Sequence, residues 1–321
     1  MENDGIKNPF SRRGFLGISS VVLASAGGLA VTDAMAQRPD RNPTDPGPAN
    51  APLDGQNPDS AWPPVTDSES LVQSFKYPFS FANKRTYEGG WSREVTVREL
   101  PVSKDMAGVN MRLTAGGVRE LHWHTADEWA IVLYGSARIT AIDRDGKSFV
   151  ADTKKNDLWY FPSGIPHSIQ GLDPDGTEFM LVFDDGNFSE SETVLLSDSM
   201  AHLPREVLSK NFGVAEAALN NLPNHELFIL QTTVPGSLEA DQNAAAGELG
   251  KSSENFAFRT MEIAPTKPTK GGEVRIVDSS ILKASTNVAM AMVTVHREAC
   301  ANCTGIQMRT NGSTTSRARE E

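Results

Sequence analysis

Alternating apolar and polar positions divide the middle of the chain into short strands separated by turns. The Asp-Arg-Asp-Gly sequence at 143–146 and the Asp-Pro-Asp-Gly sequence at 173–176 predict tight turns, because Asp, Pro and Gly favour turn geometry. Many short strands with turn signals between them predict an all-β sandwich or barrel. The expected strands are 95–100, 109–113, 129–133, 137–142, 158–161 and 179–183.

The pattern differs on both sides of this region. Residues 37–70 are rich in Pro, Asp, Asn and Gly and contain few apolar side chains, so a disordered linker is expected there. Residues 197–221 have a more helical pattern, and we expect a helical connector at 201–225. The apolar positions of the helical pattern are Leu203, Val207, Leu208 and Phe212.

A long internal repeat indicates two related domains. The sequence Gly-Gly-x-x-Arg at 89–93 recurs at 271–275, an offset of 271 − 89 = 182 residues. A period of this length indicates duplicated domains rather than a solenoid of short repeats. We therefore expect a first domain at 71–200 and a related, partial second domain at 226–296. At the same offset, Leu100 aligns with Leu282, Met111 with Val293 and Leu113 with Val295.

The composition is typical of a globular protein. Of the 321 residues, 39% are hydrophobic and 22% are charged, and the chain is long enough for one or two domains with substantial cores. The net charge is −11 and the body of the chain has no basic tract, so nucleic acid is not an expected partner. Both cysteines lie near the C-terminal end, so no disulfide framework is expected.

Residues 1–36 resemble a targeting segment. Ser-Arg-Arg-Gly-Phe-Leu at 11–16 is a twin-arginine pattern, an apolar run continues to Val31, and Ala-Met-Ala at 34–36 is a cleavage site. The run is short and rich in small residues, which favours a cleaved signal over a membrane anchor. We expect export by the twin-arginine pathway to a periplasmic or secreted location, with no stable membrane anchor after cleavage.

Two stretches of the β region carry side chains with the spacing of metal ligands. The first contains His122, His124 and Glu128, and the second, at 162–167, ends in His167. In an extended strand, residues i and i+2 share a face, so His122 and His124 point the same way. The Pro/Gly turn of the second stretch can return His167 to the same cavity. Three imidazoles and one carboxylate, with room for water or substrate, suit Mn, Fe, Co, Ni or Zn.

The full spacing resembles the double motif of the cupin superfamily. Asn156 and Gly171 depart from the usual second motif, but Asn tolerates positive φ and neither position is a ligand. The resemblance implies a cupin barrel, that is, a double-stranded β-helix or jelly roll. Together with the repeat, it implies a tandem bicupin whose second barrel is incomplete. The motif residues are Gly116, His122, His124, Glu128 and Gly135, followed by Pro162, Gly164 and His167.

From about residue 74 to residue 296 the chain resembles bicupin oxalate decarboxylases. The resemblance implies one Mn(II) site, dioxygen as co-catalyst, and oxalate as the small-molecule substrate, which is converted to formate and carbon dioxide. It is also compatible with a homo-oligomer. The implied Mn(II) ligands are His122, His124, Glu128 and His167. The matching strings are Arg-Glu-Leu-His-Trp-His at 119–124, Asp-Leu-Trp-Tyr-Phe-Pro-Ser-Gly at 157–164 and Leu-Val-Phe-Asp-Asp-Gly at 181–186.

The same resemblance suggests two catalytic residues. Arg119 can bind the distant carboxylate of oxalate through charge-assisted hydrogen bonds. Residues 189–193, Ser-Glu-Ser-Glu-Thr, resemble the family's mobile lid, with Glu190 at the position of the catalytic acid. Ser191 and Glu192 depart from the family's lid, so an oxalate oxidase stays an alternative, as does a non-catalytic metal-binding cupin. We expect His202 and His225 to lie at the surface without a catalytic role. We expect Trp129 and Trp159 to form the core or pocket wall rather than to act in catalysis.

Residues 297–321 are expected to be an out-of-frame tail that truncates the second cupin. At the repeat offset the two histidines should recur at Thr304 and Ile306, but these positions belong to a polar tail. Permitted codons for residues 297–306, read in the other frame with one added C, spell Pro-Gly-Gly-Met-Arg-Glu-Leu-His-Trp-His. On this interpretation the Cys-x-x-Cys sequence at 300–303 is accidental. The strands of the partial second cupin are expected to lack barrel partners and to expose apolar edges.

Overall fold

A computed structural model of the protein describes residues 75–297 and residue 299. The expected signal at 1–36 and the expected linker at 37–70 lie outside the described residues. The same holds for both cysteines and for nearly all of the tail that we expect to be out of frame.

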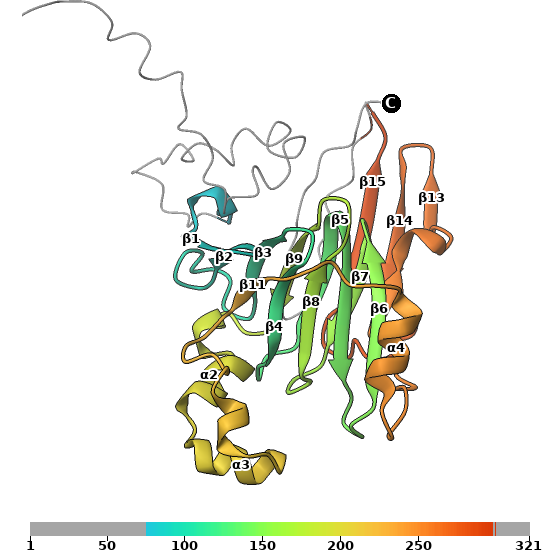
Figure 1. Ribbon diagram of the computed structural model, residues 1–321. Coiled ribbons are helices and arrows are strands. Elements are labelled where there is room, and N and C mark those ends of the chain that lie inside the picture. The colour runs from blue at the N-terminus through green and yellow to red at the C-terminus, as the bar shows by residue number, and fades with distance from the viewer. Residues whose placement is uncertain (1–74, 298, 300–321) are drawn as a thin grey trace, which may run out of the picture. The chain divides into compact units, whose positions relative to one another are not determined.

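The described chain consists mostly of strands with a few short helices (Figure 1), which confirms the predicted all-β class. None of the described helices is long and apolar enough to cross a bilayer. The strands are β1 (Lys84–Tyr87), β2 (Gly90–Val95), β3 (Ala107–Leu113), β4 (Gly117–Trp123), β5 (Glu128–Ile142), β6 (Ser148–Lys154), β7 (Asp157–Phe161), β8 (His167–Gly171), β9 (Thr177–Phe183), β10 (Val194–Leu195), β11 (Ile229–Gln231), β12 (Ala257–Arg259), β13 (Lys267–Thr269), β14 (Gly272–Val277) and β15 (Met290–Val295). The α-helices are α2 (Leu196–His202), α3 (Arg205–Phe212) and α4 (Leu238–Ala246), and the 3₁₀ helices are η2 (Phe79–Phe81), η3 (Glu190–Glu192), η4 (Glu216–Leu219) and η5 (Thr260–Glu262).

In the described part of the chain, twelve strands join in one curled antiparallel sheet whose main path is β1-β2-β3-β9-β5-β8-β4-β10. The first part of β5 pairs with β7 and β9, and its second part pairs with β6 and β8. Gly135 lies at this change of partners with φ of 69°, and a Cβ there would lie only 1.9 Å from the oxygen of Gly176. The expected strands 129–133 and 137–142 are therefore one continuous strand that bends at a glycine.

The interior of the curled sheet is filled by apolar side chains from alternate positions of the strands. This arrangement confirms the period-two pattern of the sequence, because successive side chains of a strand point to opposite faces. Burial of these side chains is the main source of stability for such a barrel. They include Val109, Met111 and Leu113 of β3 and Phe179, Leu181 and Phe183 of β9.

The expected strand at 95–100 is wrong beyond its first residue. β2 runs from Gly90 and ends at Val95, and a turn follows. The backbone N–H and the hydroxyl of Thr96 both donate to Glu99 Oε2, each at 2.9 Å, and Leu100 N donates to Thr96 O at 2.9 Å. Local hydrogen bonds of this kind compete with the ladder of a sheet.

The segment after residue 226 does not form a separate unit. β11 pairs with β4, and β12 pairs with β7, so both strands belong to the first barrel. Only β13, β14 and β15 form a second described sheet. The expectation that these later strands lack barrel partners is therefore wrong for β11 and β12, because edges of the first barrel accept them. An exposed apolar side chain does occur at Val293, on β15.

We expect Phe256→Ala to lower the free energy of unfolding by about 3–5 kcal/mol, the usual effect of truncating a buried aromatic side chain to alanine. Phe256 is fully buried in the main core, with its ring 5.3 Å from that of Phe149 and 6.3 Å from that of Phe161. Urea denaturation measures the change. Met261→Ala, at a half-exposed site of the same segment, should stay within about 0.5 kcal/mol. Equal, small effects of both changes would contradict the incorporation of this segment into the first barrel.

Candidate metal centre

The structure brings His122, His124, Glu128 and His167 together in the barrel interior. His122 lies on β4, His124 follows that strand, Glu128 begins β5 and His167 begins β8. All four side chains are buried, and one potential ligand atom from each lies within 4.8 Å of the others. We call this group the candidate metal centre.

The turn before His167 is attached to the segment that follows β4 and carries His124. Gly164 N donates to His124 O at 2.9 Å, and Ser163 N donates to Asp127 Oδ1 at 2.6 Å. His167 then pairs directly with His122 across the β4–β8 ladder. The two motifs, separated in sequence, therefore meet through backbone hydrogen bonds of a turn and a ladder.

Each of the three imidazoles is oriented by a backbone carbonyl. The Nδ1 atom lies 2.7 Å from the carbonyl oxygen of a residue two positions away, so Nδ1 carries the proton and donates. The Nε2 atoms therefore present lone pairs to the candidate metal centre, as in metal sites whose second nitrogen is held by a backbone acceptor. The carbonyl partners are Glu120 for His122, Ala126 for His124 and Ile165 for His167.

Glu128 completes the group with an ionised carboxylate. Burial raises the pKa of Glu128, but the electrostatic interactions of its carboxylate with His167 and His124 outweigh burial and lower the pKa below its usual range. The Nε1 atom of Trp159 donates to Glu128 Oε1 at 2.8 Å, which leaves Oε2 directed at the histidines. We expected Trp159 to form the core or pocket wall, and the sequence contained no signal for its hydrogen bond to Glu128.

The four potential ligand atoms are suited to binding a cation rather than to contacting one another. Burial lowers the pKa of His122 and of His167, so these imidazoles are neutral. Nε2 of His167 is buried and has no aligned hydrogen-bond partner among the described residues, although Glu128 Oε2 lies 3.3 Å away. Neutral Nε2 atoms and a carboxylate are all acceptors, and buried acceptors in contact cost free energy unless a cation or donor lies between them. Three imidazoles and one carboxylate suit a divalent transition metal.

A bulge in β4 brings Arg119 to the same face as His122. In the ladder with β8, Arg119 pairs with Ile169 and His122 pairs with His167, with a register shift between the two pairs. Three steps along β4 therefore match two steps along β8. The extra residue reverses the normal alternation, and bulges commonly redirect side chains in this way. The side chain of Arg119 consequently lies in the barrel interior and is only 2% exposed.

Glu190 also lies in a buried, charged environment, on η3 within the segment 189–193. Its Oε2 atom accepts hydrogen bonds from Arg85 Nη2 at 3.0 Å and from Ser92 Oγ at 2.9 Å. Its backbone N–H donates to Glu94 Oε2 at 2.8 Å. Burial raises the pKa of Glu190, while the positive charges of Arg119 and Arg85 act in the opposite direction. A carboxyl group with such opposed influences is suited to proton transfer.

Other residues considered in the sequence lie away from the candidate metal centre. His202, on α2, and His225 are exposed, as expected. Trp129 belongs to a second apolar cluster with Leu158 and Tyr160. The side chain of Glu192 is outside what the structure describes.

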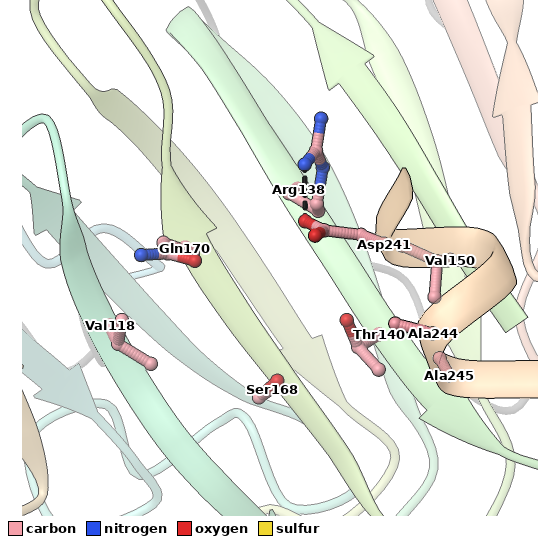
Figure 2. A pocket seen from close by; sticks show the side chains of 9 residues that line it. All are labelled: Val118, Arg138, Thr140, Val150, Ser168, Gln170, Asp241, Ala244 and Ala245. Atoms are coloured by element: carbon pink, nitrogen blue, oxygen red, sulfur yellow. Dashed lines mark hydrogen bonds and ion pairs between the residues drawn. The ribbon is translucent and has the colours of Figure 1, made fainter. Parts of the chain in front are cut away.

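A groove of about 250 Å³ lies on the opposite face of the sheet, beneath α4 (Figure 2). Ser168 and Gln170 line it and alternate along β8 with His167 and Ile169, which are buried on the interior face. The groove is therefore separate from the candidate metal centre. In Figure 2, Arg138 of β5 faces Asp241 of α4, an ion pair that attaches the helix to the sheet.

Comparisons with known proteins agree with this geometry. Residues 79–220 match the cupin family. The chain is 49% identical over 248 residues to the oxalate decarboxylase OxdC of Bacillus subtilis (strain 168), an alignment that covers 77% of this chain and 63% of that protein. It is 36% identical over 249 residues to a probable oxalate decarboxylase of Arthroderma benhamiae, covering 77% of this chain and 60% of that protein.

A solved structure is similar over the same part of the chain. It comes from a study of the Mn(II) centres in Bacillus subtilis oxalate decarboxylase and matches with a TM-score of 0.67 and 49% sequence identity. The match covers 77% of this chain and 64% of that chain. The chain thus spans less than two thirds of the length of these relatives.

Proposed function

We propose that the chain is a member of the bicupin oxalate decarboxylases, to which it is similar, and that it converts oxalate to formate and carbon dioxide at the candidate metal centre. The observation that carries the proposal is the buried group of three histidines and one glutamate, with Arg119 on the same face of β4. Mn(II), when bound by these four residues, supplies a hard, redox-capable cation for a carboxylate oxygen. We propose dioxygen as the co-catalyst.

Arg119 binds the second carboxylate of oxalate in this proposal. A guanidinium presents several N–H donors in a planar fork that matches a carboxylate. Burial lowers the pKa of Arg119, while Glu190 and Glu120 act in the opposite direction, and a guanidinium remains charged in proteins. In the barrel interior, with little competing water, the attraction between this charge and an anionic substrate is stronger than at a surface.

Glu190 moves the proton in this proposal. Decarboxylation of singly protonated oxalate requires that the proton leave an oxygen and that a proton arrive at the carbon of formate. One carboxylate can accept the first proton and then donate it, so the proton balance of the reaction is zero. The lid, residues 189–193, places Glu190 where it interacts with Arg119, next to the substrate in this arrangement.

An oxalate oxidase on the same metal centre is the second candidate, because Ser191 and Glu192 differ from the lid of the decarboxylases that the sequence resembles. Decarboxylation yields formate, whereas oxidation yields hydrogen peroxide. A non-catalytic metal-binding cupin yields neither product. The buried charges of Arg119 and Glu190 argue against this last candidate, since buried charges are costly without a functional or structural partner.

Expression in Mn-supplemented medium, followed by assay of both products from oxalate, tests the proposal. We expect formate in excess over hydrogen peroxide, with activity that depends on the metal content of the protein. Hydrogen peroxide as the main product would favour the oxidase. Absence of both products from a Mn-loaded, folded protein would contradict the proposed function.

Arg85→Gln is expected to move the acid limb of the pH profile of kcat/KM for oxalate to higher pH. Arg85 lies 3.0 Å from the Glu190 carboxylate, and its charge lowers the pKa of that group. Without it, burial and Glu94 raise the pKa of Glu190 further, opposed by Arg119. A carboxyl with a higher pKa ionises at higher pH, so Glu190 becomes able to accept a proton only at a higher pH.

The exposed Arg144 provides the control for this prediction. Arg144→Gln should leave the acid limb where it is in the unchanged protein. Oxalate titrates in the same way in assays of the unchanged protein and of both variants. A difference between their pH profiles therefore arises from a group of the protein. An acid limb that stays in place or moves to lower pH in Arg85→Gln would show that Glu190 is not the ionising group.

Export by the twin-arginine pathway is also proposed, on the basis of the pattern at 11–16 and the cleavage site at 34–36. Fractionation of cells that express the full gene tests it. We expect the processed protein in the periplasm or medium. When both arginines of the pattern are replaced by lysine, the protein should no longer be exported.

A further inference from the structure

We infer that Phe228 is a positioning residue for Arg119, contributed to the first barrel by the segment that follows residue 226. This inference rests on the proposed role of Arg119 in binding a carboxylate. Phe228 falls within the expected second domain at 226–296, but the next residue, Ile229, pairs with Arg119 in the β4–β11 ladder. Phe228 thus lies against Arg119 of the first barrel although the two residues are distant in sequence.

The ring and the carbonyl group of Phe228 both contact Arg119. The Cζ atom of Arg119 lies 3.8 Å from the centroid of the Phe228 ring. Nη1 of Arg119 donates to the oxygen of Phe228 at 3.4 Å. Each residue is only 2% exposed, so water does not weaken the attraction between the cation and the ring. One residue therefore restrains the guanidinium at two points and leaves other N–H donors for a carboxylate.

The same ring contacts the arginine that binds Glu190. The Cζ atom of Arg85 lies 5.2 Å from the centroid of the Phe228 ring, and Arg85 Nη2 donates to Glu190 at 3.0 Å. The ring of Tyr87 stacks on Phe228 with 4.8 Å between centroids. Phe228 therefore contacts both the arginine proposed to bind substrate and the arginine that holds the lid carboxylate.

The backbone of Phe228 is strained. Its φ is 56°, in the left-handed region that a bulky residue rarely adopts. Strain of this kind persists only where the surrounding structure imposes it, and it is common at functional sites. The buried carboxylate of Glu120 accepts hydrogen bonds from Phe228 N at 2.7 Å, from Leu227 N at 3.3 Å and from both Ser197 N and Ser197 Oγ. These bonds fix the conformation that directs the ring to Arg119.

Phe228→Leu is expected to raise the oxalate dissociation constant of the Mn(II)-loaded protein, and to lower kcat/KM, by about 3- to 30-fold, because the ring face is lost. Phe228→Tyr keeps the ring and should remain within about twofold of the unchanged protein. Phe149→Leu removes a ring from β6 and serves as the matched control, with no change in either quantity expected. A tyrosine variant that loses as much as the leucine variant overturns the inference.

A double-mutant cycle separates positioning from a general loss of structure. In an Arg119→Gln background, Phe228→Leu should change the oxalate dissociation constant by less than about twofold, because no guanidinium remains to be positioned. Equal effects in both backgrounds overturn the inference. Unfolding midpoints and metal contents identify a leucine variant that does not fold, and Phe228→Met then takes its place as the non-aromatic variant.

A readout without substrate distinguishes failure of this inference from failure of the proposed function. Phenylglyoxal reacts with guanidinium groups, and mass spectrometry can follow its reaction with Arg119 in the absence of oxalate. Arg119 should react faster in Phe228→Leu than in the unchanged protein, but not in Phe228→Tyr or Phe149→Leu. Equal rates in all four proteins overturn the inference. A chain that consumes no oxalate contradicts the proposed function, while the modification rates still test the contact between Phe228 and Arg119.

Discussion

Glu190→Ala is expected to lower formate production from oxalate by about two to four orders of magnitude while the metal content stays unchanged. Glu190 is buried beside two arginines, and burial raises its pKa, which suits a group that accepts and then donates a proton. It is not among the four residues whose ligand atoms converge at the candidate metal centre. Formate quantification and elemental analysis of the same preparation measure the two quantities.

Three further variants make this result specific. Glu190→Gln keeps the volume of the side chain but cannot accept and donate the proton, so it should lose activity as the alanine variant does. Glu254→Ala removes an exposed carboxylate and should leave activity unchanged. If Glu192→Ala proves to be the damaging change and Glu190→Ala does not, the proton-transferring carboxylate of the lid is Glu192.

The second large effect is expected from His124→Ala, which should reduce bound metal to less than about a tenth of that in the unchanged protein. Loss of a single group that hydrogen-bonds to a metal ligand can lower metal affinity by about 10- to 100-fold, and loss of a ligand itself should lower it further. His124 presents Nε2 to the centre because Ala126 O accepts a hydrogen bond from its Nδ1 at 2.7 Å. Elemental analysis after Mn-supplemented expression measures the metal.

The chain offers a matched control for the loss of a histidine. His202, on α2, is exposed, and His202→Ala should retain the full metal content. Thermal unfolding transitions should be measured to verify that each preparation contains the same fraction of folded protein. Stoichiometric metal in folded His124→Ala would rule out this histidine as a ligand.

Local sequence patterns were sufficient for the class of fold and for the composition of the candidate metal centre. The i, i+2 spacing of His122 and His124 along an extended segment determines that both can face one cavity. The expected tolerance of Asn156 for positive φ agrees with its φ of 71°. Such features depend on backbone geometry within a few residues, which is why they can be predicted before any tertiary contact is known.

Contacts between distant segments could not be predicted in this way. Trp159 binds Glu128 only because β7 pairs with β5. Phe228 reaches Arg119 only because β11 joins the edge of β4, although Phe228 falls within the expected second domain at 226–296. Neither residue belongs to a motif, and the relevant partners are set by strand pairing across the barrel.

The sequence by itself determined which side chains are available for metal binding and proton transfer, while the tertiary structure decided which of them share a face. Arg119 and His122 are three residues apart, so a regular strand would direct them to opposite faces of the sheet. The bulge in β4 reverses that alternation and brings both into the barrel interior. Its position depends on the register with β8, and register is set by long-range pairing and core burial rather than by the residues of β4 alone.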